Sequence, residues 1–161
     1  MSRRYSVPYT GTLTNAGGNT DLLSIQPAAN KIISLVGVKL GQTTEIGDAM
    51  EENIRITIHR MAATFTVGSG GSAVTPVPFD GNNAAAGCTT RCNDTTVATT
   101  SGADTVCEEL AWNIRNVPVE IVWPDPEARW QAINGQGLVV RCESTVTDDI
   151  TITLTFDIEE N

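Results

Sequence analysis

The sequence has little positive charge. Lysine occurs only at Lys31 and Lys39, and ten Lys+Arg stand against nineteen Asp+Glu, which gives a formal net charge of −9 and a pI near 4.4. Proteins that bind nucleic acids or anionic membranes place Lys and Arg against phosphates, so we expect neither partner. Since lysine is scarce and threonine abundant, the composition favours strands and turns over an all-helical fold.

Long apolar runs are also missing. No stretch approaches the roughly 20 apolar residues that a membrane-spanning helix needs. Arg3 and Arg4 stand near the start, but no apolar segment follows them, so we expect neither a secretory nor a twin-arginine signal. A chain of 161 residues suggests one domain, residues 1–161.

Residues suited to catalysis are few. The single histidine, His59, falls at a polar position of a predicted strand, so we expect a solvated surface side chain. Paired carboxylates such as Glu108-Glu109 and Asp148-Asp149 fall at strand ends or turns, where solvated charge is the ordinary explanation. We therefore expect no enzyme and no cofactor.

Alternating apolar and polar residues predict strands with one buried face. The clearest cases are residues 150–158 and 54–65, whose predicted core residues are Ile54, Ile56, Ile58, Ile152, Leu154 and Phe156. Further strands are expected at residues 5–13, 22–25, 31–40, 109–114, 117–123 and 137–146. About eight strands separated by turn residues predict an all-β fold, an antiparallel, jelly-roll-like β-sandwich.

Two segments fall outside this pattern. Residues 68–104 are rich in Gly, Thr and Asn, and we expect a long loop excursion there. Residues 1–12 are predicted to be an extended N-terminal arm or an edge strand, since Pro8 cannot donate to a ladder. Single helical turns are expected at residues 46–52 and 125–127.

Four cysteines permit three pairings. We expect two intrachain disulfides, Cys88–Cys92 within the loop and Cys107–Cys142 between strands, with another partner for Cys88 or Cys92 as the alternative. A zinc site is the weaker reading, because the spacing of Cys88 and Cys92 is loose and no second tight pair follows. We therefore expect no metal.

The three tryptophans raise a second possibility. Trp112 and Trp123 fall within predicted strands and are expected in the core. Trp130 follows a Pro-Asp-Pro corner and is the tryptophan expected to reach a surface or a partner. Exposed tryptophans can stack on sugars, so a carbohydrate-binding module remains an alternative.

Several strings of the first two-thirds of the chain, and more loosely its final strand, resemble one group of proteins. The strings are residues 3–7 (RRYSV), 32–35 (IISL), 40–49 (LGQTTEIGDA), 68–73 (GSGGSA), 75–76 (TP), 84–87 (AAAG) and 93–99 (NDTTVAT). The group is a family of small virion structural proteins from tailed phages and prophages. The cysteines of this chain depart from that group.

The resemblance implies a non-enzymatic structural protein, assembled in the host cytoplasm and exposed on the virion exterior. The first expectation is a capsid decoration (cement) protein that binds and stabilises the head shell. The alternative is a carbohydrate- or receptor-binding β-sandwich module of a tail or spike. Implied partners are the major capsid protein or other virion proteins, and further copies of the chain, in a trimer before a dimer.

Four residues are the expected partner contacts. Arg3, Arg4 and Tyr5 form the one cluster of positive charge with an aromatic neighbour, and Trp130 is the fourth. Arginine and aromatic residues are enriched among interface hot spots. We expect the arm to place the first three against the shell.

Overall fold

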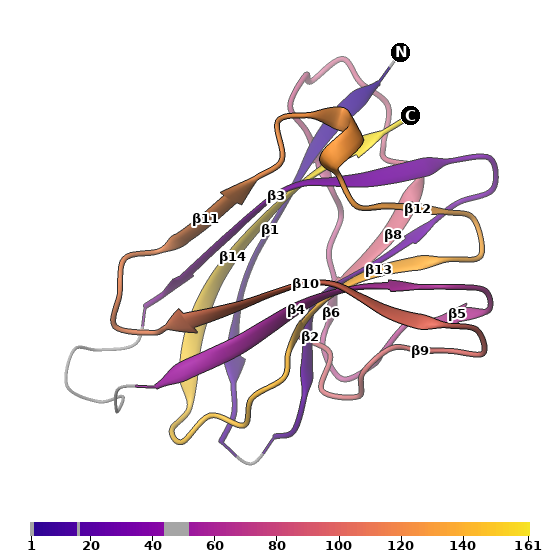
Figure 1. The fold of residues 1–161 in the computed structure, drawn as a ribbon. Coiled ribbons are helices and arrows are strands. Elements are labelled where there is room, and N and C mark those ends of the chain that lie inside the picture. The colour runs from indigo at the N-terminus through magenta and orange to yellow at the C-terminus, as the bar shows by residue number, and fades with distance from the viewer. Residues whose placement is uncertain (1, 16, 44–51) are drawn as a thin grey trace.

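The computed structural model describes residues 2–15, 17–43 and 52–161 (Figure 1). Apart from Glu52, the helical turn predicted at residues 46–52 lies outside the described residues, as do residues 44–49 of the phage-like strings. The second predicted turn is the 3-10 helix η1 (Pro126–Ala128). Its N-cap is Asp125, whose carboxylate accepts the Glu127 N–H at 2.9 Å, and proline occupies the first helical position.

The strands form two large sheets and one small one. Sheet A contains, in spatial order, β11 (Val119–Val122), β3 (Ile32–Gln42), β14 (Ile150–Glu160), β1 (Arg3–Leu13) and β7 (Val77–Pro78), and β12 (Gln131–Ile133) pairs with the first part of β3. Sheet B contains β10 (Asp104–Asn113), β4 (Asn53–Met61), β13 (Gly137–Cys142), β2 (Thr20–Pro27), β8 (Cys88–Cys92) and β6 (Ser72–Ala73). The small sheet pairs β5 (Phe65–Thr66) with β9 (Thr99–Thr100).

The main strands pair from the ends of the chain inward. β1 pairs with β14, β2 with β13, β3 with β11 and β12, and β4 with β10, all antiparallel. The chain is therefore one long hairpin rolled so that its strands alternate between two sheets, which is the jelly-roll arrangement. The predicted all-β, jelly-roll-like sandwich is confirmed, with β11 and β12 together acting as one of its eight strands.

The core lies between the two sheets. Along β14, Ile150, Ile152, Leu154, Phe156 and Ile158 are at most 2% exposed, while Thr151, Thr153 and Thr155 between them are half-buried. This is the alternation expected of a strand with one face on the core. All six core residues predicted from the sequence are buried, because the period of two assigned their face correctly.

The tip of the rolled hairpin carries an insertion, residues 62–103, between β4 and β10. The insertion adds β8 and β6 to sheet B beside β2, and β7 to sheet A beside β1. Phe65 and Ala98 of the insertion pack with Met61 and Val139 in a second apolar cluster. That cluster covers part of the outer face of sheet B, so the predicted loop excursion is a third layer of the fold.

The N-terminal segment is not a free arm. All eleven residues of β1 pair with β14, and Tyr5 and Ser6 pair with β7 on the other side. Tyr5, Val7 and Leu13 point into the core, so burial of their side chains holds the strand in the sheet. Of the two alternatives for residues 1–12, the free arm is wrong, and the edge strand is close to what is observed, because only the two-residue strand β7 lies farther out than β1.

Replacing Gly137 by alanine should destabilise the contact between the insertion and sheet B. A Cβ at Gly137 would lie 2.4 Å from the Phe65 ring, which must then shift. Overpacking of this kind costs about 1–3 kcal/mol. We expect a lower urea midpoint for Gly137→Ala and no comparable change for Gly18→Ala, because nothing lies within 4 Å of a Cβ at Gly18. Equal midpoints for the two variants would contradict this packing.

Candidate functional site

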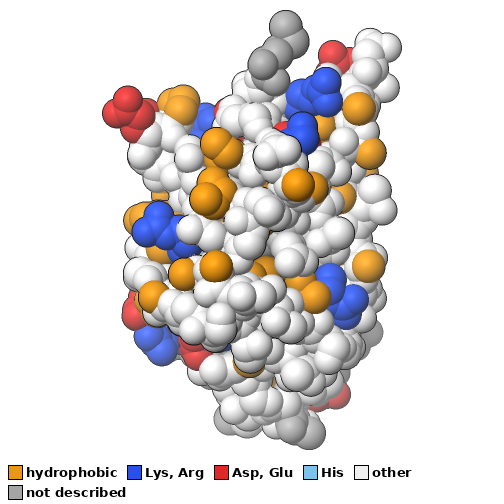
Figure 2. Space-filling model, turned by 90° about the vertical axis from the view of Figure 1, so that its right-hand side faces the viewer, with side chains coloured by type: hydrophobic (Ala, Val, Ile, Leu, Met, Phe, Trp, Pro, Cys, Tyr) orange, Lys and Arg blue, Asp and Glu red, His pale blue; other side chains and the backbone are white. Residues whose placement is uncertain are grey.

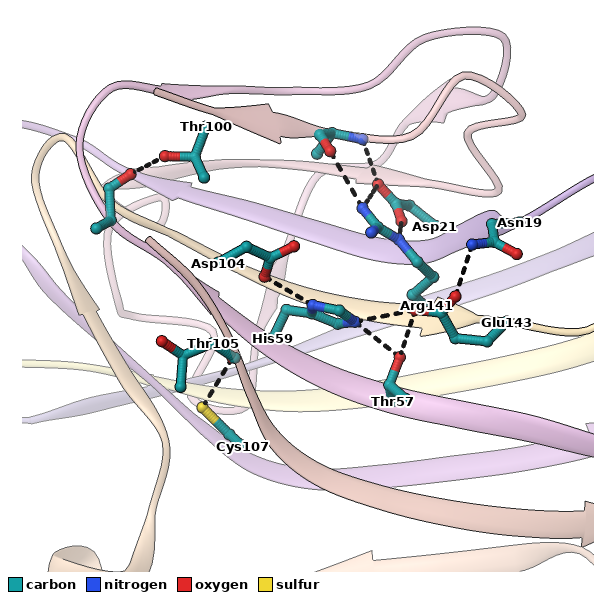
Figure 3. Close-up of polar contacts among 12 residues, drawn as sticks. Asn19, Asp21, Thr57, His59, Thr100, Asp104, Thr105, Cys107, Arg141 and Glu143 are labelled. Atoms are coloured by element: carbon teal, nitrogen blue, oxygen red, sulfur yellow. Dashed lines mark hydrogen bonds and ion pairs between the residues drawn. The ribbon is translucent and has the colours of Figure 1, made fainter. Parts of the chain in front are cut away.

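A buried ion pair joins two neighbouring strands of sheet B to the insertion (Figure 3). Arg141 of β13 donates from Nε to Oδ1 of Asp21 on β2 at 2.5 Å. The Asp21 side chain is fully buried and that of Arg141 is 8% exposed. The backbone of Ala98 in the insertion completes the group, since its N–H donates to Asp21 Oδ2 at 2.6 Å and its carbonyl accepts from Arg141 Nη2 at 3.1 Å.

A second carboxylate, that of Asp94, also fastens the insertion. Asp94 and Asp21 exchange two backbone hydrogen bonds of 3.0 Å, so the two residues form a bridge. The buried Asp94 side chain accepts from Arg91 Nη2 at 2.7 Å and from the Gly71 N–H at 2.9 Å. Residues 71, 91, 94 and 98 are thereby held against β2 and β13 by buried polar contacts. We call these contacts and the Asp21–Arg141 pair the fastening network.

Burial governs the electrostatics of this network. Burial raises the pKa of Asp21 above its ordinary value, although the hydrogen bonds from Arg141 and Ala98 and the charge of Arg141 act in the opposite direction. An unpaired charge here would keep the desolvation cost without the compensating contacts. Asp21, Arg141 and the insertion are therefore interdependent.

The only histidine of the chain lies in the next polar cluster (Figure 3). His59 Nδ1 lies 2.7 Å from Oδ1 of Asp104, and Nε2 lies 2.8 Å from Oγ1 of Thr57 and 3.2 Å from Oε1 of Glu143. Asn19 donates to the other oxygen of Glu143 at 2.6 Å. The cluster thus joins β4, the start of β10 and the segments flanking β2 and β13.

The order Asp104, His59, Thr57 matches the carboxylate, imidazole and hydroxyl of a hydrolytic triad. A nucleophile must reach its substrate, yet Thr57 is 0% exposed and His59 is 4% exposed. Glu143 also lies within hydrogen-bond distance of both His59 and Thr57. The hydroxyl is therefore committed to internal contacts, and this cluster holds strands together.

The prediction that His59 is a solvated surface residue is wrong. The alternation did place it on the outer face of sheet B, opposite the core residues Ile56 and Ile58. That face is not free, because Asp104 and Glu143 stand against the ring. A pattern that reports one strand at a time does not show which side chains of neighbouring strands lie against its outer face.

The expected disulfides are not present, and all four cysteines are free thiols. Cys88 and Cys92 are the two ends of strand β8, which separates them by about 13 Å at the rise of a strand. β4 lies between β10 and β13, so Cys107 and Cys142 are separated by two strand spacings, about 10 Å. Both separations exceed the roughly 7 Å between Cα atoms that a disulfide can span.

The expected partner contacts lie in different environments. Arg4 donates to Glu159 at 3.3 Å and its side chain is 49% exposed, while Arg3 is half-buried opposite Glu160. Tyr5 is fully buried and donates from its hydroxyl to the Ala84 carbonyl at 3.0 Å. Tyr5 is therefore not available to a partner.

Trp130, which the sequence predicts to reach a surface or a partner, is partly exposed. It is half-buried against the core, and its Nε1 donates to Glu108 of β10 at 3.1 Å. Trp130 therefore closes the gap between sheet A and sheet B on the side of their edge strands. Trp112 is buried as predicted, and Trp123 is half-buried against the same core.

Sequence reasoning missed an exposed aromatic residue. Phe79 is 64% exposed and Val77 is 53% exposed, both in the insertion beside β1. The Phe79 N–H donates to the Arg4 carbonyl at 3.0 Å, so Phe79 lies beside Arg4 at this edge of sheet A, and the side chains of both residues are exposed. The short apolar run Val77-Pro78-Phe79 within a polar loop was the available signal.

The described surface carries open grooves. One of about 350 Å³ lies between Pro27 at the end of β2 and Ala86 and Cys88 of the insertion.

The described residues contain no group of three or more His, Cys, Asp or Glu side chains arranged to hold a metal ion. In the same part of the chain, no helix is long and apolar enough to cross a membrane.

Removing the carboxylate of the fastening network should be costly. In Asp21→Ala the Arg141 guanidinium stays buried without its partner, and breaking such a pair typically costs about 3–5 kcal/mol. The matched control, Glu109→Ala, removes the exposed pair with Arg55, for which we expect almost no change. Urea unfolding gives both values, and amide exchange at Ala98 should rise in Asp21→Ala alone. Unchanged protection of Ala98 would argue against the network as the fastener.

The buried thiols should resist alkylation in the folded protein. Burial raises the pKa of Cys92 to about 12 and that of Cys142 to about 11, so almost no thiolate exists at pH 8. We expect iodoacetamide to modify the half-buried Cys107 first, and all four cysteines only after denaturation. Peptide mapping by mass spectrometry distinguishes the sites. Disulfide-linked peptides, or equally fast labelling of Cys92, would contradict the structure.

Comparison with known proteins leaves the family open. No protein-family model and no curated protein matches the chain. Among solved structures, the chain is weakly similar to structures of particles of infectious bursal disease virus.

Two such structures give the scale of this similarity. The VP2 subviral particle matches with a TM-score of 0.24 and 13% identity, over 98% of this chain and 41% of that one. Particles derived from the same virus with T=1 symmetry match with a TM-score of 0.25 and 13% identity, over 98% and 40%. The chain therefore spans about two-fifths of the length of these proteins, and we draw no conclusion from so weak a likeness.

Proposed function

We propose that the chain is a non-enzymatic virion structural protein, and specifically a decoration protein that binds the head shell. The observation that carries the proposal is the fastened insertion, which covers part of sheet B with buried ion pairs. The chain is thereby a rigid block whose polar clusters are committed to internal contacts. The phage-like strings of the sequence supply the virion context.

Rigidity suits this role for an energetic reason. A decoration protein stabilises a shell by binding the assembled state, and the stabilisation grows with its affinity. Ordering a flexible segment on binding would reduce that affinity. Because contacts with Asp21 and Asp94 already hold the insertion, it should lose little further conformational entropy on binding.

The contact surface we propose combines Arg4 and Phe79, with Arg3 beside them. The backbones of the two residues are hydrogen-bonded to each other, and both side chains are about half exposed or more. Arginine and aromatic side chains are frequent hot spots in protein interfaces. Phe79 takes the place that the sequence assigned to the buried Tyr5. The proposed partner is the major capsid protein or another virion protein.

A carbohydrate- or receptor-binding module on a tail or spike stands second. Sugar binding by stacking needs exposed aromatic faces. The three tryptophans are buried or half-buried, and Phe79 is the one aromatic among the large exposed apolar residues of the described chain. One exposed ring makes a smaller platform than the sequence suggested.

Particles from a strain that carries the gene provide the test. We expect the protein on heads at lattice-defined copy number in a cryo-EM map, and lower heat resistance of particles when the gene is deleted. The double variant Arg4→Glu, Phe79→Ala should reduce occupancy on particles. The control Val106→Ala changes a 45% exposed side chain on sheet B and should bind normally. Absence from particles, or a location at tail tips, would refute the decoration role.

A further inference from the structure

One turn between the two large sheets contains the Asn-Gly sequence of the chain. β12 of sheet A ends at Ile133 and β13 of sheet B begins at Gly137, so Asn134 and Gly135 lie where the chain crosses between the sheets (Figure 1). The Gln136 N–H donates to the Ile133 carbonyl at 3.0 Å and closes the turn. Asn134 and Gly135 are therefore the two central residues of a four-residue β-turn.

The backbone of this turn calls for a glycine after the asparagine. Gly135 has a φ of 84°, the value that a type II turn needs at its third residue. Glycine adopts this conformation without strain because it has no Cβ. The same lack of a side chain leaves the nitrogen of Gly135 unshielded.

Two further observations make that nitrogen available to its neighbour. Among the described residues, none accepts a hydrogen bond from the Gly135 N–H. The Asn134 side chain is exposed, so packing does not prevent its amide from rotating toward the nitrogen. The turn thus presents an amide carbon and an unoccupied nitrogen to each other.

We propose that Asn134 is a site of spontaneous modification in the folded protein. The backbone nitrogen of Gly135 attacks Cγ of Asn134, so that a bond from this nitrogen to Cγ forms and the bond from Cγ to Nδ2 breaks. The proton of the Gly135 N–H leaves with the side-chain nitrogen as ammonia, and a cyclic succinimide remains. Nothing is oxidised or reduced in this step.

Water completes the modification. One water molecule adds to the succinimide, and the ring opens at either of its two carbonyl carbons. One opening leaves aspartate at position 134, and the other leaves isoaspartate, whose backbone runs through the former side chain. Both products carry a negative charge that asparagine lacks, and isoaspartate also lengthens the backbone by one CH₂ group.

The longer backbone matters because the insertion rests on this turn. The Gly135 carbonyl accepts from the N–H of Phe65, the first residue of β5, at 3.2 Å. The Phe65 ring also lies 2.4 Å from where a Cβ at Gly137 would be, so it packs against the backbone just after the turn. An extra backbone atom before Gly135 displaces this carbonyl. We therefore expect isoaspartate to release the start of the insertion from sheet B.

The aspartate product should be tolerated. It leaves the backbone unaltered and adds only a charge at an exposed position. Asn134 lines a groove together with Lys31, so the new carboxylate stands on the same groove as a cation. The two products of one reaction should therefore differ in their effect on the insertion.

Peptide mapping by tandem mass spectrometry tests the site on the purified, folded chain kept in warm, mildly alkaline buffer. We expect aspartate and isoaspartate to accumulate at position 134. Asn116, an exposed turn residue followed by the β-branched Val117, should stay asparagine. The matched variant Asn134→Gln keeps an exposed amide but must close a larger ring, so it should stay unmodified.

Circular dichroism checks that the chain remains folded during the incubation. If Asn134 stayed intact in the folded chain under conditions that modify it in the urea-denatured chain, the proposal would be overturned. Equal modification of Asn116 would also overturn it, because the turn would then confer no selectivity.

Amide exchange at Phe65 separates the effects of the two products. We expect the isoaspartate form, isolated by chromatography from the incubated sample, to lose the protection of the Phe65 N–H. The variant Asn134→Asp, which carries the charge on an unaltered backbone, should keep that protection. Full protection in the isoaspartate form, or equal loss in Asn134→Asp, would contradict release by the longer backbone. None of these outcomes depends on the proposed function.

Discussion

The buried pair between Asp21 and Arg141 is the contact on which the outer layer of the molecule depends. It occupies two neighbouring strands of sheet B and at the same time binds both backbone groups of Ala98. Were Ala98 not held, Phe65 and Met61 would lose part of the cover that makes their cluster apolar. One ion pair thus connects the sandwich to more than forty residues of inserted chain.

A buried ion pair holds the insertion in place, a role that the sequence analysis assigned to disulfide bonds. A disulfide reduces the conformational entropy of the unfolded chain wherever it forms. A buried ion pair, in contrast, contributes to stability only when both partners and their hydrogen bonds are in place. The network therefore favours the native strand register, because a slipped register would leave a carboxylate or a guanidinium buried without its partner. It also forms without an oxidant, which is consistent with four free thiols.

The sandwich was predictable because its strands alternate strictly. Ile152, Leu154 and Phe156 identify a core face from period alone, and all eight predicted strands correspond to strands of the structure. The insertion was not predictable beyond its existence. Its strands β5, β6, β7 and β9 are two residues long, too short for any period to appear. The role of Asp21 was hidden for a related reason, since its partners Ala98 and Arg141 are 77 and 120 residues away.

The register of β1 against β14 has a practical consequence. Arg3 lies opposite Glu160, and the two ends of the chain emerge side by side (Figure 1). Figure 2 shows one side of the molecule, where apolar and basic side chains and a few acidic ones lie scattered among other side chains and backbone. A short linker between the ends would close the backbone into a ring with little distortion of either strand. New ends could then be opened at the exposed residues 81–82 of the insertion, which would make the protein a scaffold for circular permutation and for displaying peptides.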